Sequence, residues 1–255
     1  MTTFRNTIRS EGRPATAVEG SAVAFQPTQS TAATGRGPIR LGILLSGRGS
    51  NFLAIAESIR TGRLKNVEIA LVTSNVAEAG GIAKAREMGL PTQVLVSKGR
   101  RREEHDADVI ACMHAHHVDL VCLAGYMRLL SPAFVAAFPN RILNIHPSLL
   151  PAFPGLDAQT QAFDYGVKMA GCTVHFVDNE LDHGAIILQR AIPVLDGDDA
   201  HSLSARILIE EHIAYTEAIA RVVSGEYEIR GRRYVKAGTE GTREQTVVSF
   251  AADRS

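Results

Sequence analysis

Residues 141–157 read RILNIHPSLLPAFPGLD, and the interpretation of the whole chain starts from this pattern. An apolar run of the kind found in β-strands leads into His146. Prolines follow at positions 147, 151 and 154. Because proline fixes φ and lacks an amide donor, this second part cannot be a helix interior or a central strand. The pattern predicts a strand whose carboxyl end leads into a rigid loop.

Asn144 and His146 are the two polar side chains at the end of that strand. They stand two positions apart, so on an extended chain both side chains point to the same face. An amide and an imidazole are thereby presented together where open α/β sheets bind ligands. Taken alone, the pair is explained equally well as buried polar side chains that are satisfied by the backbone.

Strand-like and helical segments alternate through most of the chain. Short apolar runs at 39–45, 67–72, 92–96, 118–123 and 141–145 are separated by segments with helical spacing at 52–60, 81–88, 100–117 and from Pro132. This alternation predicts an α/β fold with a mostly parallel sheet and helices on both faces.

The C-terminal part follows a different pattern. After a helical segment at 158–165, two apolar runs at 172–177 and 186–194 are joined by the short connection DNELDHGA. Such a short connection favours an antiparallel pair of strands. A long amphipathic helix at 202–223 and a last edge strand at 227–235 complete the predicted elements.

Composition predicts a single folded domain with loose ends. The chain has 255 residues, of which 45% are hydrophobic, so it can bury a substantial core. No repeat or linker interrupts residues 39–235, which we expect to form one domain. Residues 1–38 are rich in Thr, Ser, Ala, Gly and Arg and predict a disordered extension. Residues 236–255 predict a loose tail.

Charge and cysteine usage narrow the class of protein. Lys plus Arg and Asp plus Glu both number 27, so no global charge favours nucleic acid or an anionic membrane. No run approaches the roughly 20 apolar residues of a membrane span. Three distant cysteines in apolar surroundings predict reduced thiols in a cytoplasmic protein, not a disulfide frame or a zinc site.

The segment Gly47–Asn51 lies between a predicted strand and a predicted helix. Its glycines let the backbone approach an anion, and the free N–H groups of the helix start point toward it. Phe52 stands where a dinucleotide motif needs another glycine, and the loop has no Walker lysine. The segment therefore predicts a site for a single phosphate, with a plain tight turn as the alternative.

Two further loops are predicted to join the same sheet edge. Gly125–Arg128 follows the strand VDLVCLA, and its Met and Arg could line an apolar slot for a flat ring. Asp178–Gly184 crowds polar and acidic residues into a turn, from which one carboxylate could orient His146 and stabilise its charged form. A packed loop and a solvated acidic turn are the alternatives.

Three other features do not predict chemistry. Adjacent histidines on a helix point apart, so the set His114, His116 and His117 predicts a solvated face, not a metal site. Ser148 lacks the G-x-S-x-G elbow of a nucleophilic serine. The arginine run 100–102 precedes two glutamates and predicts a charged helix start with a possible substrate contact.

Taken together, these motifs resemble the phosphoribosylglycinamide formyltransferase family. The resemblance runs in order through SGRGSN, AGYMRLLSPAFV, NIHPSLLPAFPG, VHFVDNELDHGAIILQ and EEHIAY, over roughly residues 39–225. It implies a Rossmann-like fold and transfer of a formyl group from 10-formyltetrahydrofolate to the amine of glycinamide ribonucleotide (GAR). Both expected substrates are small molecules. For the oligomeric state, a monomer and a homodimer are both compatible with the resemblance.

The resemblance also implies roles for individual residues. The catalytic positions correspond to Asn144, His146 and Asp182. The positions that bind the phosphate of GAR correspond to Gly49, Ser50 and Asn51, and the position that contacts its ribose corresponds to Glu211. The family's folate-binding positions correspond to Arg102, Met127, Arg128, Leu129, Leu130 and Asn144, and the backbone of residues 178–182 would contact the pterin. Asn144 and a protonated His146 would donate to the oxyanion formed as the amine attacks, and no metal is required.

Three residues depart from the family pattern, and three other functions compete with formyl transfer to GAR. The family usually has Thr or Ser at Cys172 and Pro at Ala185 and Thr216, which affects the expected folate-loop geometry. Formyltetrahydrofolate deformylase is the nearest rival, but its relatives usually carry a preceding regulatory domain. Methionyl-tRNA formyltransferase would need a C-terminal RNA-binding domain. A non-catalytic module that binds folate or nucleotide is the third alternative.

Overall fold

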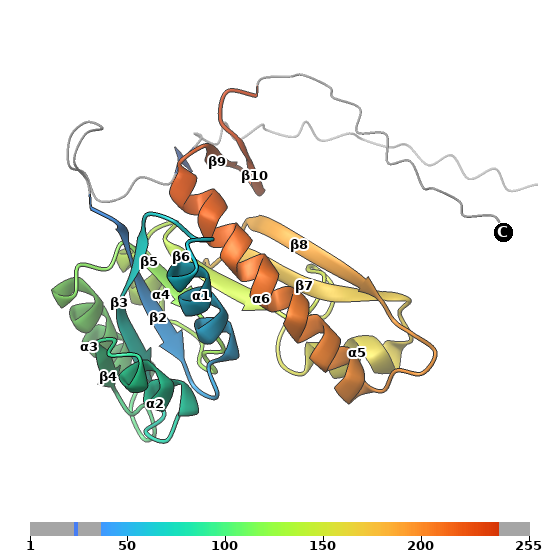
Figure 1. The fold of residues 1–255 in the computed structure, drawn as a ribbon, viewed down its shortest axis with the longest axis horizontal. Helices are drawn as coiled ribbons and strands as arrows, with labels where there is room; N and C mark the ends of the chain where they lie inside the picture. The colour runs from blue at the N-terminus through green and yellow to red at the C-terminus, as the bar shows by residue number, and fades with distance from the viewer. Residues whose placement is uncertain (1–22, 25–36, 240–255) are drawn as a thin grey trace, which may run out of the picture.

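A ten-stranded sheet forms the centre of the computed structural model, which describes residues 23–24 and 37–239 (Figure 1). The strand order is β1-β9-β10-β8-β7-β6-β5-β2-β3-β4. Most of the predicted N-terminal extension and of the C-terminal tail lies outside the described residues. Within the described part, no helix combines the length and apolar character needed to cross a lipid bilayer.

One half of the sheet is parallel, as the alternation of elements predicts. Its strands are β2 (Ile39–Leu45), β3 (Val67–Ser74), β4 (Thr92–Val94), β5 (Leu120–Leu123) and β6 (Ile142–His146). Each pairs in parallel with its neighbours in this half. The carboxyl ends of β2, β5 and β6 therefore meet at one edge, where the phosphate loop, the slot loop and the proline loop all emerge.

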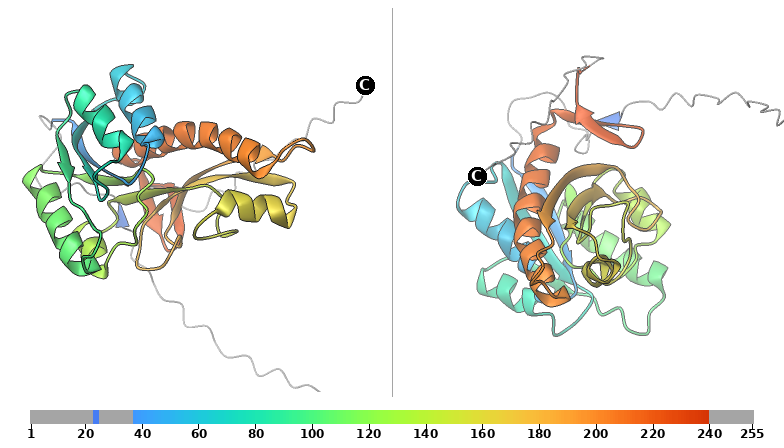
Figure 2. Two further views of the ribbon diagram at one scale, coloured as in Figure 1. Left: turned by 90° about the horizontal axis from the view of Figure 1, so that it is seen from below. Right: turned by 90° about the vertical axis from the view of Figure 1, so that its right-hand side faces the viewer.

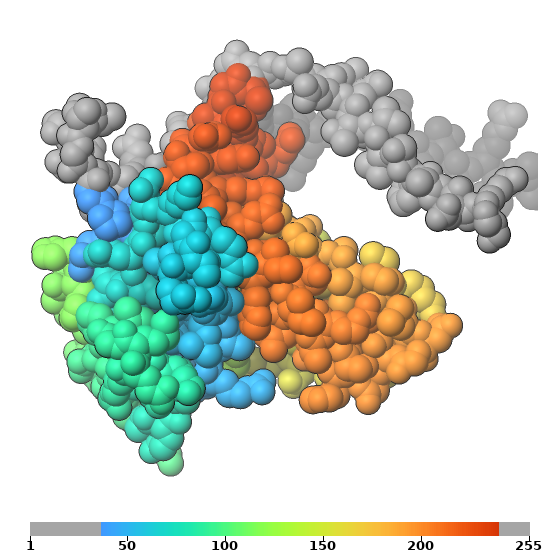
Figure 3. Space-filling model, viewed as in Figure 1, coloured from blue at the N-terminus to red at the C-terminus, as the bar shows by residue number. Residues whose placement is uncertain are grey.

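Helices cover both faces of the sheet (Figure 2). On one face lie α1 (Ser50–Arg60), α2 (Gly80–Glu87) and α6 (Ala200–Ser224), and on the other lie α3 (Arg102–Ala115) and α4 (Pro132–Ala137). Each face has its own core, built around Phe52 and Tyr215 on the first face and Met113 and Phe134 on the second. Helices α1 and α6 pack side by side (Figure 3).

Local sequence signals explain where two of the helices begin. Ser131 caps α4 by accepting from the Phe134 amide, and Pro132 occupies the first turn, where no amide donor is needed. Asp199 and Ser202 form a reciprocal capping box at the start of α6. Helix α3 is shorter at both ends than the predicted 100–117.

The C-terminal part is antiparallel where it joins β6. The strands β7 (Met169–Phe176) and β8 (Ile186–Pro193) form the predicted antiparallel pair, and α5 (Ala158–Tyr165) precedes them and contacts α6. The prediction of one edge strand at 227–235 is wrong. Gly231 adopts a positive φ of 59°, and the chain turns back to form a hairpin of β9 (Tyr227–Arg230) and β10 (Arg233–Lys236). β10 lies parallel to β8, and β1 (Val23–Ala24) pairs with β9.

Candidate active site

The proline loop after β6 is tied firmly to the neighbouring strand β7. Thr173 accepts from the Leu150 amide and donates to the Ser148 carbonyl, at 3.0 and 2.7 Å. The Ser148 hydroxyl donates to the Ala152 carbonyl at 2.6 Å, so this serine serves the loop and is not activated by a base. The structure thus places Asn144 and His146 at the mouth of a braced loop.

A buried tyrosine on α6 holds the two strands that carry the site loops. The Tyr215 hydroxyl lies 3.1 Å from the Leu123 carbonyl on β5 and 3.0 Å from the Leu143 carbonyl on β6. The side chain is fully buried, so this contact is shielded from water. Tyr215 therefore fixes the relative position of the loops that follow β5 and β6.

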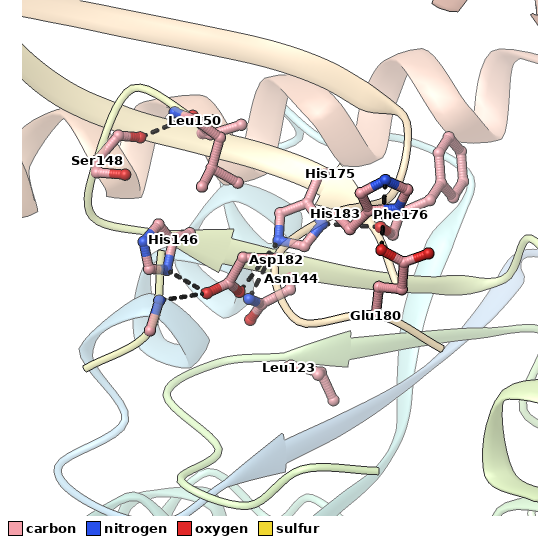
Figure 4. A network of polar contacts seen from close by, with 12 residues as sticks. Leu123, Asn144, His146, Ser148, Leu150, His175, Phe176, Glu180, Asp182 and His183 are labelled. Carbon is pink, nitrogen blue, oxygen red and sulfur yellow. Dashed lines mark hydrogen bonds and ion pairs between the residues drawn. The ribbon is translucent and has the colours of Figure 1, made fainter. Parts of the chain in front are cut away.

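The acidic turn brings Asp182 to His146, as predicted (Figure 4). Asp182 Oδ2 lies 3.4 Å from His146 Nδ1 and accepts from the Gly155 amide at 2.8 Å. The side chains of His146 and Asp182 are only 5% and 8% exposed, so water screens the pair weakly. Figure 4 shows the carboxylate between the His146 ring and the side chains of Asn144 and His175.

Both ring nitrogens of His146 face oxygen acceptors. Nε2 lies 2.8 Å from the Phe153 carbonyl, which can only accept, so Nε2 carries a proton. Nδ1 faces the Asp182 carboxylate. A donor on each nitrogen would therefore meet an oxygen acceptor.

His175 is a member of the site that the sequence did not identify. It lies opposite Asn144 in the β6–β7 register, and its Nε2 is 3.3 Å from Asn144 Nδ2. Burial lowers the pKa of His175, so the ring is neutral at pH 7. Its Nδ1–H donates to the Phe176 carbonyl at 2.7 Å, which leaves Nε2 to accept one Asn144 N–H. The second N–H of the Asn144 amide is thereby oriented. A polar residue within an apolar strand was the available signal.

The predicted phosphate loop lies at the start of α1. Gly49 adopts a positive φ of 75°, and a Cβ at this position would come within 2.9 Å of the Gly81 backbone, so glycine is required. Ser50 begins α1, and the Asn51 side chain donates to Glu211 Oε2 at 2.8 Å. The structure thus joins the two parts of the predicted nucleotide site, which come from opposite ends of the domain.

Glu211 carries a buried carboxyl group. Burial raises its pKa above the ordinary 4.5, and the hydrogen bond from Asn51 partly offsets this effect. A raised carboxyl pKa means that the folded state disfavours the charged form. The associated stability is complete below pH 4.5 and is lost as the pH rises through the raised pKa.

The slot loop after β5 contacts the phosphate loop. The Ser46 hydroxyl accepts from the Met127 amide at 2.8 Å, and the Ser46 amide donates to the Gly125 carbonyl at 3.0 Å. Met127 and Leu129 are 68% and 53% exposed, Leu130 packs against the second core, and Arg128 donates to the Arg100 carbonyl. An exposed apolar surface of this kind suits a flat ring.

Arg102 lies at the edge of the candidate site. It is the first residue of α3 and is exposed, and its side chain makes no hydrogen bond or ion pair with residues 37–239. Its neighbour Arg100 provides the link to Arg128. A role for Arg102 in ligand binding stays a prediction.

The residues that depart from the family pattern lie in packing positions. Burial raises the pKa of Cys172 to about 12, so it stays a neutral thiol. Thr216 contacts Ser58 at 3.2 Å and joins α6 to α1. His114 and His117 are exposed, as predicted for a solvated face, and the His114 ring stacks on Phe138. No group of three or more metal-binding side chains occurs among the described residues.

Comparison with known proteins gives one consistent result. A model of the family described as "Formyl transferase" matches residues 39–219. Phosphoribosylglycinamide formyltransferase of Escherichia coli is 42% identical over 72% of this chain and 86% of its own length. The crystal structure of glycinamide ribonucleotide transformylase 1 from Symbiobacterium toebii superposes with a TM-score of 0.77 at 48% identity, covering 82% of this chain and 99% of that one.

A larger relative contains the same unit. The trifunctional purine biosynthetic protein adenosine-3 of Drosophila melanogaster is 45% identical over 73% of this chain, which spans 14% of that protein. Residues 39–219, which the family model matches, include the strands, loops and helices that build the site described above. The chain therefore belongs to the formyl transferase family, in the group of the phosphoribosylglycinamide formyltransferases.

Proposed function

We propose that this protein transfers the formyl group of 10-formyltetrahydrofolate to the amine of GAR in purine biosynthesis. The observation that carries the proposal is the meeting of Asn144, His146 and Asp182 beside two binding loops at one sheet edge. The names of the relatives support the choice of substrates. The unpaired cysteines support a cytoplasmic, reducing location.

The proposed reaction is an acyl transfer through a tetrahedral intermediate. The amine nitrogen attacks the formyl carbon, and the carbonyl electron pair moves onto the formyl oxygen. The free N–H of Asn144 and an N–H of His146 donate to this oxyanion, and Asp182 stabilises the imidazolium. The amine then loses a proton, N10 of the folate gains one, and the bond from the formyl carbon to N10 breaks. Asp182, assisted by water, serves that proton transfer.

The proposal requires an exchange of acceptors at His146. In the structure its Nε2–H donates to the Phe153 carbonyl in the proline loop. The formyl oxygen takes over this donor when the substrates are in place. Phe153 adopts a positive φ of 51°, so its carbonyl is held by an uncommon backbone conformation rather than by regular structure.

The two substrates would occupy opposite sides of the catalytic residues. Gly49, Ser50 and Asn51 offer the phosphate the start of α1, and Glu211 offers a carboxylate to the ribose hydroxyls. The folate would lie on the slot loop, against the exposed Met127 and Leu129 and near Arg102, Arg128 and Leu130. The acidic turn at 178–182 would meet the pterin.

Release of tetrahydrofolate from 10-formyltetrahydrofolate, followed with and without GAR, tests this function. We expect release only when GAR is present. Equal release without GAR would identify a formyltetrahydrofolate hydrolase instead. No release in either reaction, from protein that binds the folate, would identify a non-catalytic binding module.

Glu211→Gln is expected to weaken the binding of GAR while it stabilises the fold. The amide keeps an acceptor for Asn51 but removes the buried charge, so Tm at pH 7.5 should rise and the gain should vanish toward pH 4.5. A neutral acceptor binds hydroxyls more weakly by about 1.4 kcal/mol, so KM for GAR should rise roughly tenfold. Thermal melts across pH and initial-rate kinetics measure both effects.

Asp164→Asn is a matched control, because it neutralises an exposed carboxylate on α5 that makes no hydrogen bond or ion pair among the described residues; it should change neither Tm nor KM for GAR. An unchanged KM for GAR in Glu211→Gln would remove this residue from the proposed ribose site.

A further inference from the structure

The turn that carries Asp182 is held from the outside by the C-terminal hairpin. Arg232 is in the two-residue turn between β9 and β10. Its Nη2 donates to the His183 carbonyl at 2.6 Å, and its Nη1 contacts His183 Nε2. The hairpin is in place for this contact because β10 pairs with Ile186, the first residue of β8.

His183 continues the same chain of contacts into the acidic turn. Its Nδ1 lies 2.9 Å from Asp178 Oδ2, so the ring is between the arginine and the carboxylate. Asp178 in turn accepts from the Glu180 amide at 3.0 Å. One arginine from the end of the domain thereby braces the turn through both a main-chain carbonyl and a side chain.

The turn needs such a brace because its backbone is uncommon. Asp182 adopts a positive φ of 49°, a region that L-residues disfavour. On its inner side the turn is fixed by the bond from the Gly155 amide to Asp182 and by Gly184, where a Cβ would come within 1.9 Å of the Phe176 carbonyl. The carbonyl between these two fixed points belongs to His183, and Arg232 binds it.

We propose that Arg232 is a positioning residue for formyl transfer. It holds the 178–184 turn so that Asp182 stays against His146 and the backbone of the turn keeps its shape for the pterin. The inference rests on the proposed function. Arg232 touches neither the Asn144 amide nor the phosphate loop, so its effect reaches the reaction only through this turn.

Steady-state kinetics of Arg232→Ala, with both substrates varied, test the inference. A small displacement of a catalytic group is costly, so kcat should fall roughly tenfold and KM for 10-formyltetrahydrofolate should rise several-fold. KM for GAR should stay within about twofold of the unaltered protein, because Glu211 and the phosphate loop are held independently. Arg232→Lys, which keeps a cationic donor, should recover part of kcat.

Arg233→Ala provides a matched control on the same hairpin. Arg233 is exposed, and its side chain makes no hydrogen bond or ion pair with the described residues. Its loss should leave kcat and both KM values unchanged. Thermal melts verify that each variant is folded; if Arg232→Ala is not, Arg232→Gln is measured in its place.

The results separate three cases. If the unaltered protein shows no GAR-dependent turnover, the proposed function fails. If that protein is active and Arg232→Ala matches Arg233→Ala in kcat and both KM values, the positioning role is overturned. A loss of kcat with no change in either KM and no recovery by lysine would likewise overturn it, because a reduced folded fraction explains that pattern.

Discussion

Replacing His146 with alanine is expected to lower kcat by a factor on the order of a hundred or more. The substitution removes the cationic donor to the developing oxyanion and leaves Asp182 without its partner. The phosphate loop and Glu211 are untouched, so KM for GAR should change little. Single-turnover kinetics with both substrates saturating measure the loss in the chemical step directly.

The fold should survive this change. The proline loop keeps its bonds from Ser148 and to Thr173, none of which involves His146. Circular dichroism should therefore match that of the unaltered protein. His201→Ala, which removes an exposed histidine at the start of α6, is the matched control and should retain full activity. Turnover by His146→Ala within a few-fold of the unaltered protein would contradict the assigned role.

Asn144→Ala should have the second largest effect, a loss of about a hundred- to a thousandfold in kcat. It deletes the neutral oxyanion donor and frees His175 Nε2 from its partner. Because the donor acts on charge that develops only in the transition state, the affinity for both substrates should be nearly unchanged. Equilibrium binding and kcat, measured on the same preparation, separate the two effects.

Gln93→Ala is a suitable control, because this exposed amide lies on the edge strand β4 and its side chain makes no hydrogen bond among the described residues. A large rise in KM for either substrate with an unchanged kcat in Asn144→Ala would show that the amide binds ground states. The oxyanion role would then be wrong.

The sequence alone predicted the elements that local chemistry determines. The apolar run and its prolines placed the strand before His146, and the alternation of residues put Asn144 on the same face. The short connection between β7 and β8 predicted their antiparallel pairing. The acidic turn predicts one carboxylate at His146, the family resemblance implies that it is Asp182, and the structure gives that contact.

Features that depend on register between distant segments were beyond prediction. His175 reaches Asn144 only because β7 runs antiparallel to β6 in one particular register. The Asn51–Glu211 bond needs α1 and α6 to pack side by side. The sequence predicts one strand where the C-terminal hairpin lies, because a single glycine at position 231 is a weak turn signal without a partner strand.

The fate of the formyl carbon tests the central claim most directly. The protein is incubated with GAR and with 10-formyltetrahydrofolate that carries ¹³C in the formyl group, and the products are identified by NMR and mass spectrometry. Direct transfer through the Asn144–His146 site predicts that the label appears in an amide on the glycinamide nitrogen, in equal amount to the tetrahydrofolate released. Label recovered as free formate, with GAR unchanged, would contradict the account.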